Sequence, residues 1–532
     1  MKRTDVLWIT TLVLGWIFDF LFWKHGVGIN FAIYAVLCLA GGFLVLGMNG
    51  IRPSWKSLLV LLPILFFAAM TFIRLEPMSM FLSGAFTLGL MGVLAVTFLG
   101  GRWAWYSLSD YVANFARLAG SLFARPLIFL VESRKQVQAA GQAGESGGAA
   151  RARWKRVWAI LRGILIAVPV VAIFAALLSS ADVVFAQRLH DFTRLFRLEN
   201  LPEYIFRAVY ILIGAYALAG ILLHAALKSK DEKLLGMDKP LVPAFLGFTE
   251  ATVVLGAVVL LFGAFVIIQF QYFFGGQTNI GVQGYTFSEY ARKGFGELVA
   301  VAFFSLLLFL GLSAIAKRQS PAQRWTFSGL GLGMVALVGI ILVSAFQRLL
   351  LYEAAYGSSR LRMYTHVFMI WLGALLAVVV VLDILRRERF FAFAALVASL
   401  GFAATLMLAN VDGAIVRENV ARAAAGESLD VAYLASLSSD AVPAMVQAFQ
   451  SPTVPARTRE AVGAALACRS SLVKPPKKSD WHAFTLSRFW ADSAFSSVQG
   501  SVDNYYVHQD EYHIRVDSPQ GDTFNCIDYS GD

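Results

Sequence analysis

Charged residues are scarce in this sequence. Only 15% of its 532 residues are Asp, Glu, Lys or Arg, whereas soluble chains carry about 25%. Hydrophobic residues make up 58% of the chain, and the mean hydropathy is +0.65. Such an apolar excess has to face lipid, where only helices and closed barrels satisfy every backbone hydrogen bond. The composition therefore excludes a water-soluble globular enzyme and indicates a multi-pass membrane protein.

Catalytic motifs are absent as well. The sequence has no phosphate-binding glycine loop, no HExxH motif, no kinase signature and no GxSxG motif. His508 and His513 lie among aspartates near the C-terminus, but their spacing matches no known set of metal ligands. We therefore expect no catalytic residue, no bound metal and no cofactor, although a membrane-embedded transferase stays open.

Cysteine is rare, with three residues in the whole chain. Cys38 lies inside an apolar stretch, whereas Cys468 and Cys526 fall in the polar C-terminal part. A disulfide between these two persists only in an oxidising compartment outside the cytoplasm. The sequence leaves both a disulfide and a reduced pair open.

Long apolar stretches are what the sequence has instead. Eleven of them approach the roughly 20 residues that an α-helix needs to cross the hydrocarbon core. The first continues to Trp23 without a small-residue cleavage site, so we expect it to remain as an anchor. The predicted spans are 6–23, 29–48, 58–73, 80–99, 157–178, 205–227, 251–270, 298–316, 327–345, 367–385 and 390–409.

Basic residues predict the orientation. A net charge of +11 would suggest nucleic acid in a soluble protein, but here Lys and Arg gather in alternate loops. Basic residues hold cytoplasmic loops against the anionic inner leaflet. The N-terminus, with Lys2 and Arg3, is therefore expected in the cytoplasm, and an odd number of spans places the C-terminal part outside it. No nucleic-acid partner is expected.

Four regions follow from this pattern. Residues 1–131 form an N-terminal membrane region of about four spans, in which 111–131 is predicted to be an amphipathic helix at the membrane surface. Residues 132–156 lack periodicity and are predicted to be a flexible cytoplasmic linker. Residues 157–409 form a membrane core of about seven spans. Residues 410–532 form a small, mostly helical extracytoplasmic region, called the tail below.

Two stretches of the sequence resemble a known family. The residues that carry the resemblance are 271–276, the motif from Gly284 through Glu289 and Gly294 to Glu297, and the positions Asn410, Asp412, Arg417, Asn419, Leu429, Asp430, Tyr433, Leu437, Asp440 and Pro443. Over residues 156–449 the chain resembles a bacterial family of multi-pass membrane proteins known as domain of unknown function 4173, with family 4153 as a close look-alike. The resemblance implies a bacterial inner-membrane protein with a polytopic core, and it implies no activity.

The first of these stretches contains a row of charges. Thr286 and Glu289 have the spacing of a capping box, which predicts that a helix begins there. Glu289, Lys293 and Glu297 recur every four residues and share one helix face, with Arg292 beside them. An ionisable group at membrane depth, as expected for Glu297, marks a functional candidate. The alternative is a pair between Lys293 and Glu297 that only anchors the helix at the interface.

Three arginines lie on the side that the orientation rule depletes of positive charge. Arg348, Arg360 and Arg362 belong to the predicted outer loop between the ninth and tenth spans. They have two explanations. One is pairing with a carboxylate, for which the candidates are Glu289, Glu297, Glu353 and Asp412. The other is an anionic ligand, such as a lipid phosphate, held by guanidinium groups.

Two functions follow. In the first, the protein handles an anionic or lipid-linked solute at the outer face of the membrane, at a site formed by Glu289, Arg292, Lys293, Glu297, Arg348, Arg360 and Arg362. In the second, it is a non-catalytic scaffold or signalling partner whose extracytoplasmic tail binds an envelope protein. The expected partners are the lipid bilayer, an anionic lipid or lipid-linked solute, and an envelope protein.

Overall fold

The computed structural model describes residues 3–141, 201–230, 234, 244–274, 295–472, 480–509 and 514–527, with scattered positions between 163 and 188. The chain forms two compact units. The first unit consists of Met1–Trp23, Leu37–Arg52 and Ala116–Lys228. The second unit consists of Lys24–Val36, Pro53–Phe115 and Ser229–Asp532.

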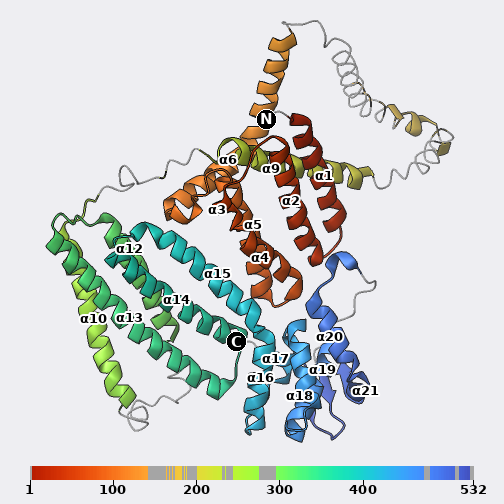
Figure 1. Ribbon diagram of the computed structural model, residues 1–532. Helices are drawn as coiled ribbons and strands as arrows, with labels where there is room; N and C mark the ends of the chain where they lie inside the picture. The colour runs from red at the N-terminus through yellow and green to blue at the C-terminus, as the bar shows by residue number, and fades with distance from the viewer. Residues whose placement is uncertain are drawn as a thin grey trace. The chain divides into compact units, whose positions relative to one another are not determined.

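Helices dominate the described part of the chain, and eleven of them are long and apolar enough to cross a membrane (Figure 1). This confirms the predicted all-α, multi-pass membrane protein. The helices that contribute are α1 (Thr4–Phe22), α2 (Ile29–Met48), α3 (Trp55–Leu58) with α4 (Leu61–Ile73), α5 (Pro77–Thr97), α6 (Leu108–Gly141), α9 (Leu201–Leu227), α10 (Phe248–Phe274), α12 (Phe295–Ile315), α13 (Pro321–Tyr356), α14 (Arg360–Ile384) and α15 (Phe391–Ala409).

The eleven helices differ in one member from the eleven predicted spans. The part Leu108–Ser133 of α6 qualifies with a mean hydropathy of 1.2, the lowest among the candidates. The sequence predicts this stretch as a surface helix instead, and Pro126 lies inside it. The predicted fifth span, 157–178, lies mostly outside the described residues. The remaining ten candidates correspond to predicted spans.

In the first unit, α1 and α9 pack as an antiparallel pair. Near the end of α1, Asp19 accepts hydrogen bonds from Arg207 Nε at 2.9 Å and from the Tyr210 hydroxyl at 2.9 Å, both near the start of α9. The opposite ends also meet, because Leu7 and Leu223 share a small hydrophobic core. A Cβ atom at Gly15 would lie 2.8 Å from a backbone oxygen of α9. The two helices therefore approach closely because Gly15 has no side chain.

Part of α6 belongs to the same unit. Ser121 Oγ lies 2.8 Å from His224 Nδ1, near the end of α9. Phe129 packs against Leu7 at the start of α1 and Val45 at the end of α2. Both contacts lie at the end of the unit that contains the start of α1. This stretch of α6 therefore lies across one end of the unit.

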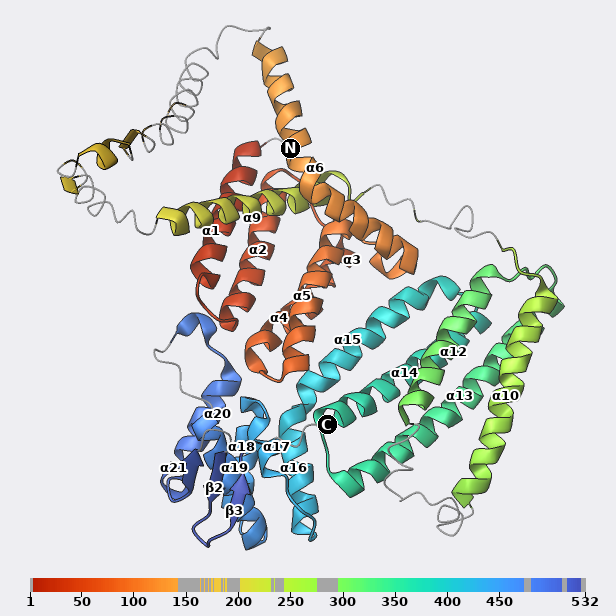
Figure 2. The ribbon, with the colours of Figure 1, turned by 180° about the vertical axis from the view of Figure 1, so that it is seen from behind.

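In the second unit, α10, α12, α13, α14 and α15 form a helical bundle (Figures 1 and 2). Its shared core is built from large apolar side chains that include Leu255, Met334, Ile341 and Leu376. The start of α13 is fixed by a capping box in which the Ser320 side chain accepts from the Gln323 amide.

α5 and α15 of the second unit are antiparallel. Arg74, before α5, donates from Nε to the carbonyl of Met407 near the end of α15 at 2.8 Å. At the other end, Trp103 follows α5, and its ring centroid lies 5.5 Å from that of Phe393 at the start of α15. The tail therefore follows α15 on the side where α5 begins.

The tail is a compact module in the second unit. Its elements are α16 (Val411–Ala424), α17 (Val431–Ser436), a 3-10 turn η7 (Ser439–Ala441), α18 (Val442–Gln450), α19 (Ala456–Leu472), α20 (Leu486–Ser496), α21 (Gln499–Val502), β1 (Tyr506–Gln509), β2 (Ile514–Asp517) and β3 (Thr523–Asn525). The strands form an antiparallel sheet in the order β1-β2-β3, and β2 packs against α19 (Figure 2). Buried side chains of several tail helices join Val516 of β2 in one core.

Residues 430–449 have apolar side chains at helical spacing and residues 505–516 alternate like a strand, but in the structure both stretches are broken into shorter elements. The helical pattern over 430–449 becomes α17, η7 and α18, since Ser438 caps η7 and Pro443 lies in the first turn of α18. The strand pattern over 505–516 becomes the pair β1 and β2, in which Val507 faces Val516. Hydrophobic periodicity predicts the type of these elements but misses the interruptions.

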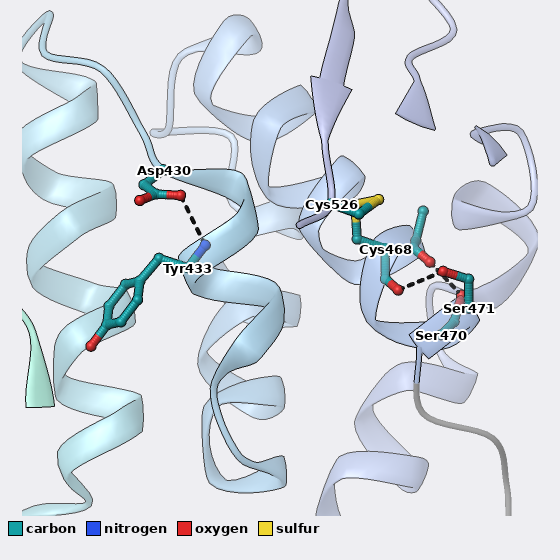
Figure 3. The surroundings of a disulfide bond; sticks show 7 residues. Asp430, Tyr433, Cys468, Ser470, Ser471 and Cys526 are labelled. Atoms are coloured by element: carbon teal, nitrogen blue, oxygen red, sulfur yellow. Dashed lines mark hydrogen bonds between the residues drawn. A yellow bond between two sulfur atoms is a disulfide. The ribbon is translucent and has the colours of Figure 1, made fainter. Parts of the chain in front are cut away.

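A disulfide closes the tail. Cys468 on α19 is bonded to Cys526 after β3, and both residues are buried (Figure 3). The bond joins positions 58 residues apart, with their Cα atoms 5.2 Å apart. Of the two states that the sequence leaves open, the structure has the disulfide. Cys38 in α2 takes no part in this disulfide.

Candidate functional site

The structure gives positions to four of the seven predicted site residues. Glu289, Arg292 and Lys293 lie outside the described residues. Glu297 is exposed on the first turn of α12. Arg348 lies on α13 and is half-buried. Arg360 and Arg362 begin α14, and no contact between described residues joins Glu297 to these two arginines.

Arg360 binds a buried carboxylate of the tail. Its Nε lies 2.8 Å from Asp412 Oδ1, and its Nη2 lies 2.7 Å from Asp412 Oδ2. Asp412 is fully buried on the first turn of α16 and also accepts the Ser438 amide at 2.7 Å. The Asn410 side chain caps α16 and so fixes the helix start from which Asp412 projects. Arg360 is therefore paired with one of the four carboxylates that the sequence suggested.

Arg362 contacts the turn between α13 and α14. Its guanidinium donates to the carbonyl of Gly357 and lies over the ring of Tyr352, 4.1 Å from the centroid. Gly357 ends α13 with a φ of +80°, a conformation that L side chains rarely adopt. A Cβ atom there would also lie 2.6 Å from Asn419 Oδ1. The side chains of Arg362 and Asn419 therefore both pack closely against this turn.

Asp440 of the tail binds the turn before α5. Its Oδ2 accepts the amides of Leu75 at 2.7 Å and Glu76 at 2.9 Å. Arg74 lies 3.6 Å from Asp440 Oδ1. Only 3% of the Asp440 surface is exposed. This carboxylate therefore fastens η7 of the tail to the turn between α4 and α5.

Glu76 extends the contacts to α14. Its carboxylate caps α5 by accepting the amides of Met78 at 2.9 Å and Ser79 at 2.7 Å. The hydroxyl of Tyr364, one turn into α14, donates to the same carboxylate. A neighbouring tyrosine of the tail, Tyr433, accepts the Arg360 amide at 2.9 Å. Burial raises the pKa of Tyr433, so it stays a neutral phenol.

These residues form one network, which we call the boundary network: Arg74, Glu76, Arg360, Tyr364, Asp412, Tyr433 and Asp440. Removing one partner of a buried ion pair is strongly destabilising. The network joins three membrane helices to three tail elements, α16, α17 and η7, and contains no activated nucleophile with a companion base. The network is therefore suited to a structural role, in which it attaches the tail to the membrane helices.

Sequence analysis missed Arg74 and Glu76, and it named Asp440 only among the residues that carry the family resemblance. Glu76 lies directly before Pro77, the pattern of a helix N-cap followed by proline, and this signal identifies a cap but not a tertiary contact. Asp440 binds the Glu76 amide across 364 residues of sequence. No local pattern reports such a pairing.

A cavity lies where α13 starts and α14 ends, at the end of the bundle opposite to Arg360. It has a volume of about 370 Å³ and is lined in part by Arg318, Arg324, Arg386 and Asp383. Arg318 donates from Nη2 to the Ser313 carbonyl at 2.8 Å. Three guanidinium groups and one carboxylate give this cavity a positive balance, so an anion is the ligand class that fits it.

Comparison with known families gives one match. The family described as "Domain of unknown function (DUF4153)" matches residues 61–448, a range that contains every residue of the boundary network. The resemblance drawn from the sequence begins only near residue 156, whereas the family match begins at residue 61 and therefore also includes α5. Membership of family 4173 is not confirmed. No curated protein and no solved structure matches the chain.

Proposed function

Because the chain belongs to the DUF4153 family, whose description assigns no activity, we propose a function from the boundary network. The protein is a multi-pass membrane anchor that holds its tail as a rigid module outside the cytoplasm and presents it to an envelope protein. This is the scaffold function of the two that the sequence suggested. It fits a chain in which the tail is substantial and the network is closed.

The observation that carries this proposal is the position of two buried tail carboxylates. Asp412 binds Arg360 of α14, and Asp440 binds the backbone of Leu75 and Glu76. A tail that served only as a loose extension would need no more than its covalent link to α15. Desolvated charges at two separate contacts support a module held in one position.

Helix directions in the first unit agree with the predicted series of spans. α9 runs antiparallel to α1, because Asp19 meets Arg207 while Leu7 packs with Leu223. With the N-terminus in the cytoplasm, α9 then begins outside. The four spans before α6 return the chain to the cytoplasm. An odd number of crossings therefore has to lie between α5 and α9.

With the N-terminus in the cytoplasm, the helix directions of the second unit place the tail outside. α5, the fourth span, enters from outside, and α15 is antiparallel to it. α15 therefore leads outward, and the tail follows it. The Cys468–Cys526 disulfide agrees with this side, since such bonds persist outside the cytoplasm.

Strand β1 is the surface that we propose for the partner. It is an edge strand of the described sheet, and all four of its residues are exposed. Tyr506 is 70% exposed and Val507 37% exposed. An exposed edge strand offers free backbone groups to a further strand, and apolar side chains beside it add specificity.

Crosslinking pull-downs of the full chain test the scaffold function. We expect the double variant Tyr506→Lys, Val507→Lys to lose a specific envelope protein that the wild type retains. Gln499→Lys, an exposed change on α21, is the matched control and should retain it. An unchanged set of captured proteins in the double variant would reject β1 as the docking surface.

Handling of an anionic solute or lipid stays a second proposal. The observation in its favour is the cavity with Arg318, Arg324 and Arg386, which lies at the end of the bundle opposite to Arg360. Native mass spectrometry should then detect a bound anionic lipid that the Arg324→Gln, Arg386→Gln variant loses. For the predicted outer site, charge-neutral changes of Glu297 and Arg362 should abolish transport at normal protein levels. A collapse of those levels would mark the two residues as structural.

A further inference from the structure

Three polar side chains from distant parts of the sequence meet in the second unit. His25 follows α1, whereas Asp480 and His482 precede α20. His25 Nδ1 lies 2.7 Å from Asp480 Oδ2, and His482 Nδ1 lies 2.7 Å from Asp480 Oδ1. The two imidazole rings are stacked, with their centroids 3.8 Å apart. One carboxylate thus joins two imidazoles across 455 residues of sequence.

The backbone on both sides of this cluster is held in place. The Ile29 amide donates to the Phe484 carbonyl at 2.9 Å. A Cβ atom at Gly28 would lie 2.7 Å from backbone atoms of Ala483 and Phe484, so the two segments touch. The buried Asn30 side chain accepts the Gly28 amide at 2.8 Å and shapes the loop. The histidine and the aspartate therefore come from segments that are already fixed against each other.

The donor atoms have the spacing of a metal site. One ligand atom from each of the three residues lies within 4.8 Å of the other two. Ligands of a tetrahedral Zn²⁺, each about 2.1 Å from the metal, are separated by about 3.4 Å. The two nitrogen-to-oxygen distances of 2.7 Å would need to open by less than 1 Å. One of the stacked rings would also have to turn, because each Nδ1 lone pair lies in its ring plane and both have to point at the metal. Two imidazoles and one carboxylate favour zinc-type cations over Mg²⁺ or Ca²⁺, which prefer oxygen ligands.

Burial and charge agree with this chemistry. His482 is 8% exposed, while the His25 and Asp480 side chains are 31% and 32% exposed, so an ion can reach the cluster. The Asp480 carboxyl group has one oxygen 2.7 Å from each imidazole nitrogen, so it supplies the acidic ligand beside both nitrogen ligands.

We propose that His25, Asp480 and His482 bind one zinc-type divalent cation that fastens the tail to the loop after α1. Three protein ligands leave a fourth position for water. The cation would act as a third attachment of the tail, beside the Arg360–Asp412 and Asp440 contacts of the boundary network. The proposal does not depend on the identity of any protein partner.

Zinc retention by the purified full chain tests the proposal. The protein is stripped with a chelator, incubated with Zn²⁺ or Mg²⁺, and freed of unbound metal, after which the metal content is measured. We expect about one Zn²⁺ and no Mg²⁺ per chain. The variant His25→Gln changes a partly exposed residue and should reduce zinc retention at least tenfold. Asp480→Asn should do the same.

His508→Gln is the matched control. His508 is an exposed histidine of the same tail that pairs with Asp517 at 2.8 Å, so its loss should leave zinc retention unchanged. Zinc should raise the Tm of the wild type and of this control, but not that of His25→Gln. Wild-type protein without stoichiometric zinc, or His25→Gln with wild-type retention, would overturn the proposal and leave a hydrogen-bonded cluster only.

Discussion

Arg360 binds Asp412 through two parallel hydrogen bonds, Nε to Oδ1 at 2.8 Å and Nη2 to Oδ2 at 2.7 Å. The arginine begins a membrane helix, and the aspartate is fully buried in the first turn of a tail helix. This bidentate geometry is the strongest form of an arginine–carboxylate contact. The pair therefore connects the membrane bundle of the second unit to the tail at a defined position.

Breaking this pair should destabilise the protein strongly. Asp412→Asn leaves the Arg360 guanidinium without its charged partner, at an expected cost of about 3–5 kcal/mol. Thermal unfolding in detergent measures the effect. Glu427→Gln is the matched control, because Glu427 pairs with Arg422 at 3.4 Å but is 58% exposed, and an exposed pair contributes only about 0–1 kcal/mol. Equal Tm values for the two variants would contradict the structural role of Asp412.

Removing the disulfide should loosen the tail. In the Cys468→Ser, Cys526→Ser variant, the 58-residue loop is no longer closed in the unfolded state, and a loss of about 4 kcal/mol is expected. The Tm of the tail should fall under non-reducing conditions. Cys38→Ser, which changes a cysteine of α2 that takes no part in the disulfide, should have a small effect. A double variant as stable as the wild type would show that the tail does not depend on the bond.

The contact between α1 and α9 should depend on Gly15. Leu at this position would place its Cβ 2.8 Å from the Ile211 carbonyl and 3.3 Å from Ala215 Cβ, so the helices would have to separate. Overpacking of this kind costs about 1–3 kcal/mol. Gly47→Leu on α2 is the control, since no atom lies within 4 Å of a Cβ there. Expression level and Tm should fall for Gly15→Leu only, and an equal fall in both would point to a general effect of leucine.

The chain should cross the membrane once between α5 and α9. The α6 residues Ser121 and Phe129 contact the end of the first unit that holds the start of α1, which favours a surface position for α6. The apolar stretch 157–178, most of which lies outside the described residues, is the span that the sequence predicts there. Reporter fusions after residue 141 and after residue 200 should give opposite locations, with the first in the cytoplasm. Fusions after Arg52 and after Arg74 calibrate the two sides, and equal locations for 141 and 200 would contradict this topology.

The membrane helices could be predicted from the sequence because a span is a local property. Twenty apolar residues in a row identify a span without knowledge of its neighbours, and ten of the eleven predicted spans correspond to candidate helices on that basis. The position of α6 cannot be predicted in this way, because its mean hydropathy of 1.2 and its amphipathic pattern are compatible with both a span and a surface helix.

The tertiary polar contacts were only partly predictable. Arg360 and Arg362 are candidate site residues because they place positive charge on the side that the orientation rule depletes. Asp412 is one of the carboxylates that the sequence suggests as their partner. Asp440 and His25 gave no such signal. Asp440 meets the α4–α5 turn across more than 360 residues, and His25 meets Asp480 across 455. Such pairings arise from the packing of whole elements, which a single sequence does not display.

A cryo-electron-microscopy structure of the full chain in lipid nanodiscs tests the central claim most directly. The density to inspect lies at the start of α14, where Arg360 and Arg362 meet the tail. We predict that the Asp412 carboxylate is hydrogen-bonded to the Arg360 guanidinium and that the other contacts of the boundary network are present. Lipid-shaped density on Arg348 and Arg362, with Asp412 turned away from Arg360, would contradict the scaffold function and favour handling of an anionic lipid at the outer face.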